Sequence, residues 1–368
     1  MLSVNMSSIS QAWWFVVAFV MAAAFVVALI GPAKRLGLVD HPAGRKAHEV
    51  PTVLVGGLAI FLSALVTQFL AGLLMEQSAS LLIALLVVVG IGLADDAHEI
   101  GYRSKFFAQL IAALVIVSGT SIHVMHLGDI FGVGDFALGK WSYLITVIAI
   151  IGLMNAYNMI DGLDGLAGTQ VLLSAAAFAL VALSAGDLRL GLELLILCGA
   201  IAGFLVFNLR SYWLKRGLVF LGDTGGLLLG ILLAWYSIKL AGAETAPLRP
   251  ITAVWILAVP LLDMGAVMFL RMRQHKSPFH PDRQHLHHIL LDAGFSVSQV
   301  VFLMGTMAVA CSALALLCEA YSVPEFVMFG AFIGLLLAYG KLLATPKLLH
   351  LPGRAAVHVV HFPADSKF

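Results

Sequence analysis

Carboxylate and amide side chains cluster at three points of an otherwise apolar chain. The first cluster, GLADDAHEIGYRSK, places Asp95 and Asp96 side by side at the end of an apolar run. Adjacent carboxylates repel each other unless a cation or a proton lies near them. Lys105 follows closely and can provide an anion-binding edge. The pattern predicts a site for a cation or a proton, with a helix end wetted at an interface as the alternative.

The second cluster, NAYNMIDGLDGLAG, repeats a polar residue at every third position. Its members are Asn155, Asn158, Asp161 and Asp164. This spacing predicts a polar stripe along one side of a helix. Two carboxylates and two amides that face one way favour a metal or ligand site over a stripe that only joins helices.

The third cluster, FLGDTGG, puts Asp223 among glycines where another apolar run begins. A helix N-terminus favours phosphate groups, and a carboxylate there can hold a divalent metal that bridges them. A simple N-cap is the alternative. The sequence of this cluster alone leaves both interpretations open.

Histidines are concentrated in the segment SPFHPDRQHLHH. Its residues of interest are Arg283, His285, His287 and His288. The pattern predicts a short helix over 282–293, with His285 and His288 on its polar face and His287 at the edge of that face. A zinc helix would space its histidines four residues apart, which this segment does not do. An anion cradle, in which histidine and arginine donate to phosphate oxygens, fits better.

The elements that must position these clusters are apolar runs, each about 20 residues long and thus sufficient to cross a bilayer as a helix. The chain is 61% hydrophobic and 11% charged, against roughly 25% charged residues in soluble domains. An all-α integral membrane protein is therefore predicted, since a β-barrel would require short alternating strands. The eleven expected spans are 12–31, 53–74, 80–94, 106–123, 141–160, 166–184, 190–209, 218–239, 251–270, 299–318 and 324–343.

The basic residues predict how these spans are oriented. If the N-terminus lies outside, the inside segments contain every Lys and Arg residue except Lys140, Arg189, Lys239 and Arg249. This bias follows the positive-inside rule. The N-terminus is therefore predicted to lie outside, and the C-terminus and all the polar clusters on the inside, cytoplasmic face. One polytopic domain is expected over 1–345, followed by a short cytoplasmic tail over 346–368.

A basic loop, GRKAHEVPTVLVGG, adds Arg45 and Lys46 on the same side. Such a loop is most often a topology determinant, and it can also hold an anionic lipid head group. Carboxylates for Mg²⁺, amides and basic groups at one membrane edge are what phosphoryl transfer requires. A transporter that couples carboxylates to protons or cations is the alternative from another class, although its carboxylates are expected near the midplane.

The motifs ADD, NMIDGLDGLAG, FLGDTGG and PDRQHLHH resemble, in order and topology, those of the polyprenyl-phosphate N-acetylhexosamine-1-phosphate transferases. The resemblance extends from about Arg35 to Leu343 and is greatest with the bacterial branch that uses undecaprenyl phosphate. It implies transfer of GlcNAc-1-phosphate from UDP-GlcNAc to undecaprenyl phosphate, with release of UMP and with Mg²⁺ or Mn²⁺ as the cofactor. It also implies the first membrane step of O-antigen or enterobacterial common antigen synthesis. GalNAc or a modified hexosamine is the alternative sugar.

The resemblance further implies roles for individual residues. The matches to catalytic positions are Asp95, Asp96 and Asp161, and the matches to metal-binding positions are Asp223 and Asn158. The matches to positions near the nucleotide sugar and its phosphates are Asp164, Arg283, His285, His287 and His288. The matches to positions near the lipid phosphate are Arg45, Lys46 and Lys105. The family usually has serine where this chain has Gly226, so no role is carried over to that position.

The resemblance also sets the expected surroundings of the protein. The resemblance implies a multi-pass protein in the bilayer of a bacterial inner membrane, with its N-terminus in the periplasm, a homodimer as its expected assembly and no nucleic-acid partner. Direct attack by the lipid phosphate and a two-step route through an aspartyl intermediate both remain open on the sequence.

Overall fold

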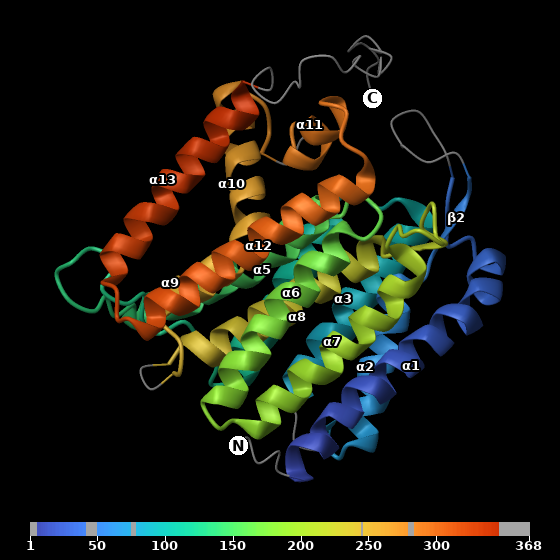
Figure 1. Ribbon diagram of the computed structural model, residues 1–368, viewed down its shortest axis with the longest axis horizontal. Coiled ribbons are helices and arrows are strands. Elements are labelled where there is room, and N and C mark those ends of the chain that lie inside the picture. Colours follow the sequence, from blue (N-terminus) through green and yellow to red (C-terminus); the bar gives the residue numbers. More distant parts are fainter. Residues whose placement is uncertain (1–5, 42–49, 75–78, 244–245, 279–282, 346–368) are drawn as a thin grey trace.

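The computed structural model describes residues 6–41, 50–74, 79–243, 246–278 and 283–345, most of which are helical (Figure 1). The first helices are α1 (Met6–Arg35), α2 (Gly56–Leu70), α3 (Ala79–His98), α4 (Tyr102–Gly119), the short η2 (Gly139–Trp141), α5 (Ser142–Ile160) and α6 (Leu166–Ser184). The remaining helices are α7 (Leu188–Asn208), α8 (Gly222–Ala241), α9 (Pro250–Ile256), α10 (Ala258–Arg273), α11 (Leu286–Asp292), α12 (Val297–Ala320) and α13 (Glu325–Ala344).

Eight helices in the described part of the chain are long and apolar enough to cross a membrane. They are α1, α3, α5, α6, α7, α8, α12 and α13. Helices α9 and α10 meet at an angle of 84° and form a broken span or a re-entrant loop, which raises the count to nine if the pair is one span. The prediction of a mostly helical membrane protein is confirmed. All eleven predicted runs lie on helices, but α2, with 15 residues, and α4 do not belong to the eight.

A small sheet lies at one end of the helices and was not predicted. It consists of β1 (Val39–Asp40), β2 (Thr52–Leu54) and β3 (Val219–Phe220), in the order β1-β2-β3. Strand β1 is antiparallel to β2, and β2 is parallel to β3, with Val53 opposite Val219. Strands β2 and β3 lead into α2 and α8 respectively, so their pairing places the first turns of these two helices at the same level.

Helix α8 occupies the centre of the bundle. Almost all of its residues are buried, and it packs most extensively against α3 and α5, with α2 and α6 completing its surroundings. Apolar residues cover its whole circumference, as expected for a helix enclosed by others. Any side chain in its first turn is therefore held by contacts from several neighbouring helices.

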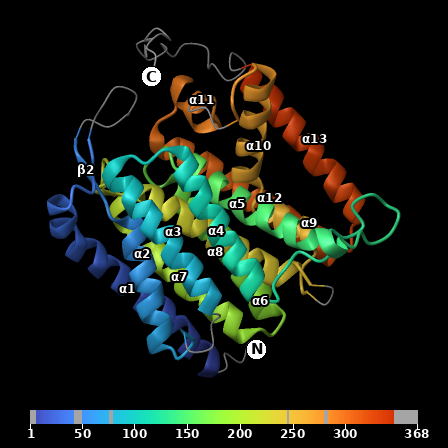
Figure 2. The ribbon, with the colours of Figure 1, turned by 180° about the vertical axis from the view of Figure 1, so that it is seen from behind.

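Helix α1 lies along the edge of the molecule and packs closely on α7 (Figures 1 and 2). A Cβ atom at Gly199 would lie 2.2 Å from the carbonyl oxygen of Phe15, and one at Gly203 would lie 2.3 Å from that of Phe19. In lipid, helices associate through close van der Waals packing rather than through the hydrophobic effect, and small residues four apart permit it. These two glycines therefore determine how closely α1 approaches α7.

Glycines also bring α2 and α3 against the first turn of α8. A Cβ atom at Gly57 would lie 2.3 Å from the amide nitrogen of Gly225, and one at Gly92 would lie 2.4 Å from the Cα atom of Thr224. Neither position has room for a methyl group unless the backbone of α8 moves. Both glycines therefore fix the position of the turn that carries Asp223.

The substitution Gly92→Ala tests this contact. We expect it to lower the free energy of unfolding by about 1–3 kcal/mol, because the added methyl group overpacks the α3–α8 interface. Thermal unfolding of the purified protein in detergent measures the effect. Gly90→Ala is the matched control, because it lies on the same helix and its Cβ would meet nothing within 4 Å. Equal unfolding temperatures for the two variants would contradict the proposed close approach.

Candidate active site

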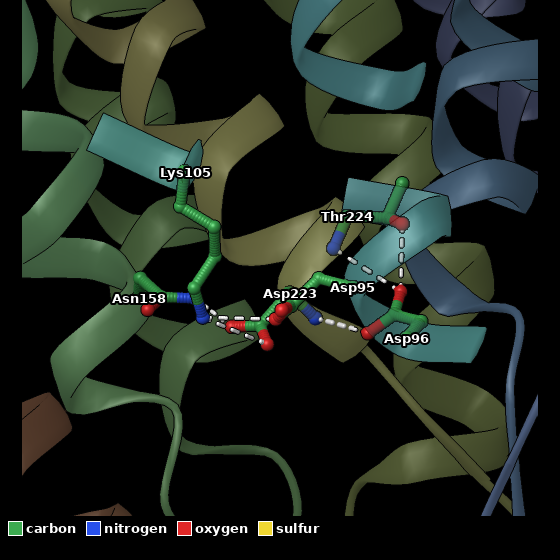
Figure 3. Close-up of polar contacts among 6 residues, drawn as sticks. All are labelled: Asp95, Asp96, Lys105, Asn158, Asp223 and Thr224. Atoms are coloured by element: carbon green, nitrogen blue, oxygen red, sulfur yellow. Dashed lines mark hydrogen bonds and ion pairs between the residues drawn. The ribbon is translucent and has the colours of Figure 1, made fainter. Parts of the chain in front are cut away.

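Four helices bring their polar ends together at one end of the bundle. Asp95 and Asp96 lie in the last turn of α3, and Lys105 lies in the first turn of α4. Asn158 lies in the last turn of α5, and Asp223 lies in the first turn of α8. Figure 3 shows the side chains of Lys105, Asn158, Asp95 and Asp223 pointing toward one another, while Asp96 points to Thr224. One site thus combines two acidic clusters that are more than a hundred residues apart in sequence. This agrees with the prediction that the acidic clusters lie on one face of the protein.

The ammonium group of Lys105 lies between two carboxylates. Its Nζ atom is 2.8 Å from Asp95 Oδ2 and 3.5 Å from Asp223 Oδ2. The Asn158 amide donates a further hydrogen bond to Asp223 Oδ1. The Asp95 side chain is only 5% exposed, and carboxylates this close together in a medium of low dielectric constant need a cation between them. Lys105 provides that cation here.

The same pair of carboxylates has the donor atoms that Mg²⁺ prefers. Asp95 Oδ1 is buried and has no hydrogen-bond partner among the described residues. Mg²⁺ is commonly held by one or two carboxylates, with phosphate oxygens and water completing its octahedron. The described residues contain no ready-made group of three or more metal-ligating side chains. Asp95 and Asp223 therefore fit an ion that is completed by the phosphates of a substrate.

Asp96 faces the other way and caps α8. Its Oδ1 atom accepts from the amide of Asp223 at 2.7 Å, while its Oδ2 atom accepts from the Thr224 amide at 3.2 Å and the Thr224 hydroxyl at 2.7 Å. Gly222, with φ of +75°, would place a Cβ atom 2.6 Å from Asp96 Oδ2. Both oxygens of Asp96 thus hold the backbone that carries Asp223, whereas Asp95 keeps an oxygen available.

The polar stripe predicted over 155–164 is only partly helical. Asn155 and Asn158 lie on α5, but the helix ends before Asp161, and Asp161 and Asp164 lie in the turn that precedes α6. The prediction of a single helix is wrong because glycines interrupt it, and Gly165 has a left-handed φ of +82°. The turn instead brings its two carboxylates to the same end of the bundle as Asp223.

Asp161 lies near several other carboxylates. Burial, and then the charges of Asp223, Asp96 and Asp164, raise the pKa of Asp161 to about 8. A carboxyl group with such a pKa can hold or release a proton near neutral pH, which is typical of catalytic acids and bases. The structure therefore supports Asp161 as a proton-carrying candidate.

Asp164 is held by the segment that follows α7. Its Oδ2 atom accepts from Arg210 Nε at 2.7 Å and from the amide of Gly217 at 3.0 Å. Asn208 adds to this connection, because its Oδ1 atom accepts from the amide of Gly165 at 2.7 Å. These contacts tie the α5–α6 turn to the chain that leads into β3 and α8.

The histidine segment differs from its prediction. Helix α11 begins at Leu286, so His285 is its N-cap residue rather than part of a polar helical face. His285 and His287 are buried, with exposed fractions of 6% and 1%, and His288 is half-buried. The helical-wheel assignment is wrong for His285 and His287 because both pack against other parts of the protein. Arg283 lies apart, with its Nη2 atom 3.9 Å from Asp292 Oδ1.

His287 connects this segment to the carboxylate turn. A Cβ atom at Gly162 would lie 2.2 Å from His287 Nε2, so the imidazole lies directly against the backbone beside Asp161. Burial, followed by the neighbouring His288, lowers the pKa of His287 to about 3. His287 is therefore uncharged at neutral pH, and its contribution to an anion site is that of a neutral hydrogen-bonding group.

Several side chains at this end of the bundle were not predicted from the sequence. They are Gln109, which accepts from Asn155 at 2.7 Å, Thr224, Arg210 and Asp263. Asp263 carried a usable signal, because it is an acidic residue within the run 251–270 and intramembrane ionisable residues are functional candidates. The others become recognisable only through their tertiary partners.

Three remaining positions complete the comparison with the sequence. Arg45 and Lys46 lie outside the described residues. At Gly226, a Cβ atom would lie 3.0 Å from Asn158 Cα and 3.1 Å from Asn158 Nδ2. The missing side chain thus lets α8 approach α5 closely at Asn158, and a serine there would contact the asparagine amide directly.

Comparison with known proteins gives one consistent family. The pattern described as glycosyl transferase family 4 matches residues 78–241. The undecaprenyl-phosphate alpha-N-acetylglucosaminyl 1-phosphate transferase of Escherichia coli (strain K12) is 33% identical over 309 residues, which cover 84% of each chain. The transferases of the same name from Haemophilus influenzae and Yersinia pestis are 36% and 31% identical, and the matches cover 83% and 91% of this chain and 86% and 92% of theirs.

The cap formed by Asp96 generates a prediction. In Asp96→Asn one acceptor oxygen becomes an amide whose N–H groups face the donors of α8, so the free energy of unfolding should fall by about 1–2 kcal/mol. Thr224→Val, which removes only the hydroxyl donor, should cost less. Denaturant or thermal unfolding in detergent measures both, with the exposed Asp292→Asn as the control. An unfolding curve for Asp96→Asn that matches the control would show that this carboxylate does not anchor α8.

Proposed function

The chain belongs to glycosyl transferase family 4, and from this we propose that it transfers N-acetylglucosamine 1-phosphate from UDP-GlcNAc to undecaprenyl phosphate and releases UMP. The family agrees with the one indicated by the sequence motifs. The names of the relatives support both the sugar and the polyprenyl acceptor. Because the matches cover 83% or more of each chain, they support assigning the complete reaction of these relatives to this protein.

The observation that carries the proposal is the pair of carboxylates bridged by Lys105. Phosphoryl transfer requires little covalent work from a protein, but it requires charge neutralisation and positioning at the phosphates. The site provides a cationic donor in Lys105 and an amide in Asn158. It also provides a buried carboxylate oxygen of Asp95 that has no hydrogen-bond partner among the described residues. Together with Asp223, these groups come from four helix ends, so their spacing is fixed before substrate binds.

Mg²⁺ is the cofactor that these groups fit, with Mn²⁺ as a substitute of similar coordination. Asp223 and Asp95 would hold it, and Asn158 would orient Asp223 through the hydrogen bond already present. When bound, the ion neutralises the diphosphate and polarises its P–O bonds. Lys105 would then be free to contact a phosphate oxygen in place of the second carboxylate.

The reaction is best described as direct attack. An oxygen of the lipid phosphate forms a bond to the β-phosphorus of UDP-GlcNAc, and the bond from that phosphorus to the bridging oxygen breaks, so that UMP leaves. Asp161 is the candidate to take the proton of the lipid phosphate, because burial and the charges of Asp223, Asp96 and Asp164 raise its pKa to about 8, which makes its ionised form a stronger base than an ordinary carboxylate. We assign His287, which lies against Gly162, to the sugar-nucleotide side of the site, following the role that the family resemblance implies for the histidine motif. A labelled phosphosugar trapped on the enzyme without lipid phosphate would replace this route by a two-step one.

We further place this site at the cytoplasmic face of a bacterial inner membrane, in a chain of eleven spans with its N-terminus in the periplasm. The bias of basic residues toward the predicted inside segments supports this orientation. The ends of α3 and α5 and the beginnings of α4 and α8 meet at one site, which supports a single reactive face. UDP-GlcNAc would reach it from the cytosol, and undecaprenyl phosphate from the bilayer.

The reaction and its metal requirement are tested together. Purified protein supplied with UDP-GlcNAc, undecaprenyl phosphate and Mg²⁺ should release UMP, and chelation of Mg²⁺ should stop the release until the ion is restored. Asp223→Asn should lower kcat/KM by at least about a hundredfold, because metal stabilisation of phosphate charge is worth several kcal/mol. The control is Asp129→Asn, in the segment that follows the far end of α4. Full activity of Asp223→Asn, or no UMP release from the unmodified chain, would contradict the proposal.

The histidine segment gives a separate prediction. His288, whose ring centroid is 4.2 Å from that of His287, should support binding of the sugar nucleotide. We expect His288→Ala to raise KM for UDP-GlcNAc about tenfold, the cost of a lost hydrogen bond to a charged group. The Mg²⁺ concentration for half-maximal activity should stay unchanged. A shift in the Mg²⁺ requirement without a change in KM would instead place the metal at the histidines.

A further inference from the structure

A buried carboxylate in α10 lies outside the groups assigned so far. The Asp263 side chain is only 1% exposed, and it accepts three hydrogen bonds from two other parts of the chain, the beginning of α11 and helix α13. His285 Nδ1 donates to its Oδ2 atom at 2.6 Å, while the Leu286 amide and the Tyr339 hydroxyl donate to its Oδ1 atom at 3.0 and 2.9 Å. Figures 1 and 2 show α11 beside α10 and one end of α13, the helices that these bonds connect.

The contacts on both sides of the His285 ring determine its tautomer. A carboxylate can only accept, so Nδ1 carries the proton in the bond to Asp263. On the opposite side, Arg271 Nη2 is 3.4 Å from Nε2, and a guanidinium group can only donate. His285 is therefore a neutral imidazole protonated at Nδ1, and it links a buried anion to a buried cation.

Arg271 is itself held in place. Its side chain is 3% exposed, and its Nη1 atom donates to the carbonyl oxygen of Pro278 at 2.7 Å. An isolated buried charge is expensive, and a pair that is joined and fully hydrogen-bonded is tolerated. The row Asp263–His285–Arg271 satisfies this requirement through the imidazole, so the orientation of the ring follows from the burial of both charges.

The ordered ring of His285 in turn positions His287. The two imidazoles are stacked, with centroids 5.6 Å apart and planes inclined by 14°. The other edge of His287 rests against Gly162, next to Asp161. A continuous row of contacts thus runs from Tyr339 on α13, through α10 and α11, to the carboxylate turn. The Nδ1 atom of His287 is buried and has no partner among the described residues, so it remains available to a ligand.

We propose that Asp263 and Tyr339 are positioning residues, which fix the Nδ1–H tautomer and the orientation of His285 and thereby hold His287 at the sugar-nucleotide side of the carboxylate site. The inference rests on the proposed function for its kinetic consequences and on geometry alone for the tautomer. It assigns His285 an indirect role, because both of its ring nitrogens already have protein partners. Direct contact with the substrate is then left to His287, together with the neighbouring His288.

The first test measures the tautomer without any substrate. The full-length protein in lipid nanodiscs is labelled with ¹⁵N-histidine, and the His285 signal among the 13 histidines is identified by its loss in His285→Gln. The ring nitrogen shifts should report protonation at Nδ1. In Asp263→Asn the amide donates toward Nδ1 instead, so the shifts should report protonation at Nε2. An unchanged His285 tautomer in Asp263→Asn would overturn the proposal.

The second test measures how each substitution changes the kinetic constants for the two substrates. For UDP-GlcNAc, kcat/KM should fall about tenfold or more in Asp263→Asn and about fivefold in Tyr339→Phe, in line with charged and neutral hydrogen bonds. KM for undecaprenyl phosphate should stay constant, because the row ends at the sugar-nucleotide side. Tyr321→Phe, which removes the hydroxyl of an 80% exposed tyrosine at the C-cap of α12, is the matched control and should leave both constants unchanged.

The outcomes separate this inference from the proposed function. If the unmodified protein releases no UMP but Asp263→Asn changes the tautomer, the function fails and the positioning of His285 stands. If the protein is active and Tyr339→Phe affects both substrates equally or neither, the positioning role fails and the function stands. Tyr339→Phe keeps the ring in place, so it decides the question even if Asp263→Asn does not fold.

Discussion

The ion pair network of Lys105 with Asp95 and Asp223 is the interaction on which the polar end of this protein depends. Two carboxylates from α3 and α8 can approach each other in a low-dielectric environment only if a cation neutralises them. This requirement brings the first turn of α4 to the same point. The close contacts of Gly57 and Gly92 with α8, and the cap that Asp96 places on that helix, then follow as the means of holding Asp223 there.

Much of this arrangement can be predicted from the sequence because it depends on local chemistry. Apolar runs predict helices in lipid, where every backbone polar group must be satisfied within the segment. The sequence also identifies Asp95, Asn158 and Asp223, because polar residues at the ends of such runs are costly without a shared partner. Their convergence follows from placing all the acidic clusters on one face, which the positive-inside rule made possible. Local pattern and topology therefore suffice to locate the carboxylate site.

The sequence does not predict which hydrogen-bond or ion-pair partner each polar side chain has. Asp95 and Asp96 are adjacent and chemically identical, yet Asp96 caps α8 while Asp95 pairs with Lys105, because successive residues of a helix point in different directions. The prediction for the histidine segment was wrong for a related reason. A helical wheel contains no tertiary contacts, so it cannot detect that His285 bonds the buried Asp263 of α10, which in turn accepts from Tyr339 of α13. Partner choice is a tertiary property.

Satisfied and unsatisfied polar atoms divide this end of the bundle into two kinds of group. Asp96, Asp263 and His285 have partners for the atoms that could face a ligand, and burial without orphaned atoms is typical of groups that hold a structure in place. Asp95 Oδ1 and His287 Nδ1 are buried without a partner in the described part of the chain. Each such atom costs on the order of 1–3 kcal/mol in the absence of ligand. A ligand that supplied a cation to the Asp95 oxygen and a hydrogen-bonding group to the His287 nitrogen would recover that free energy.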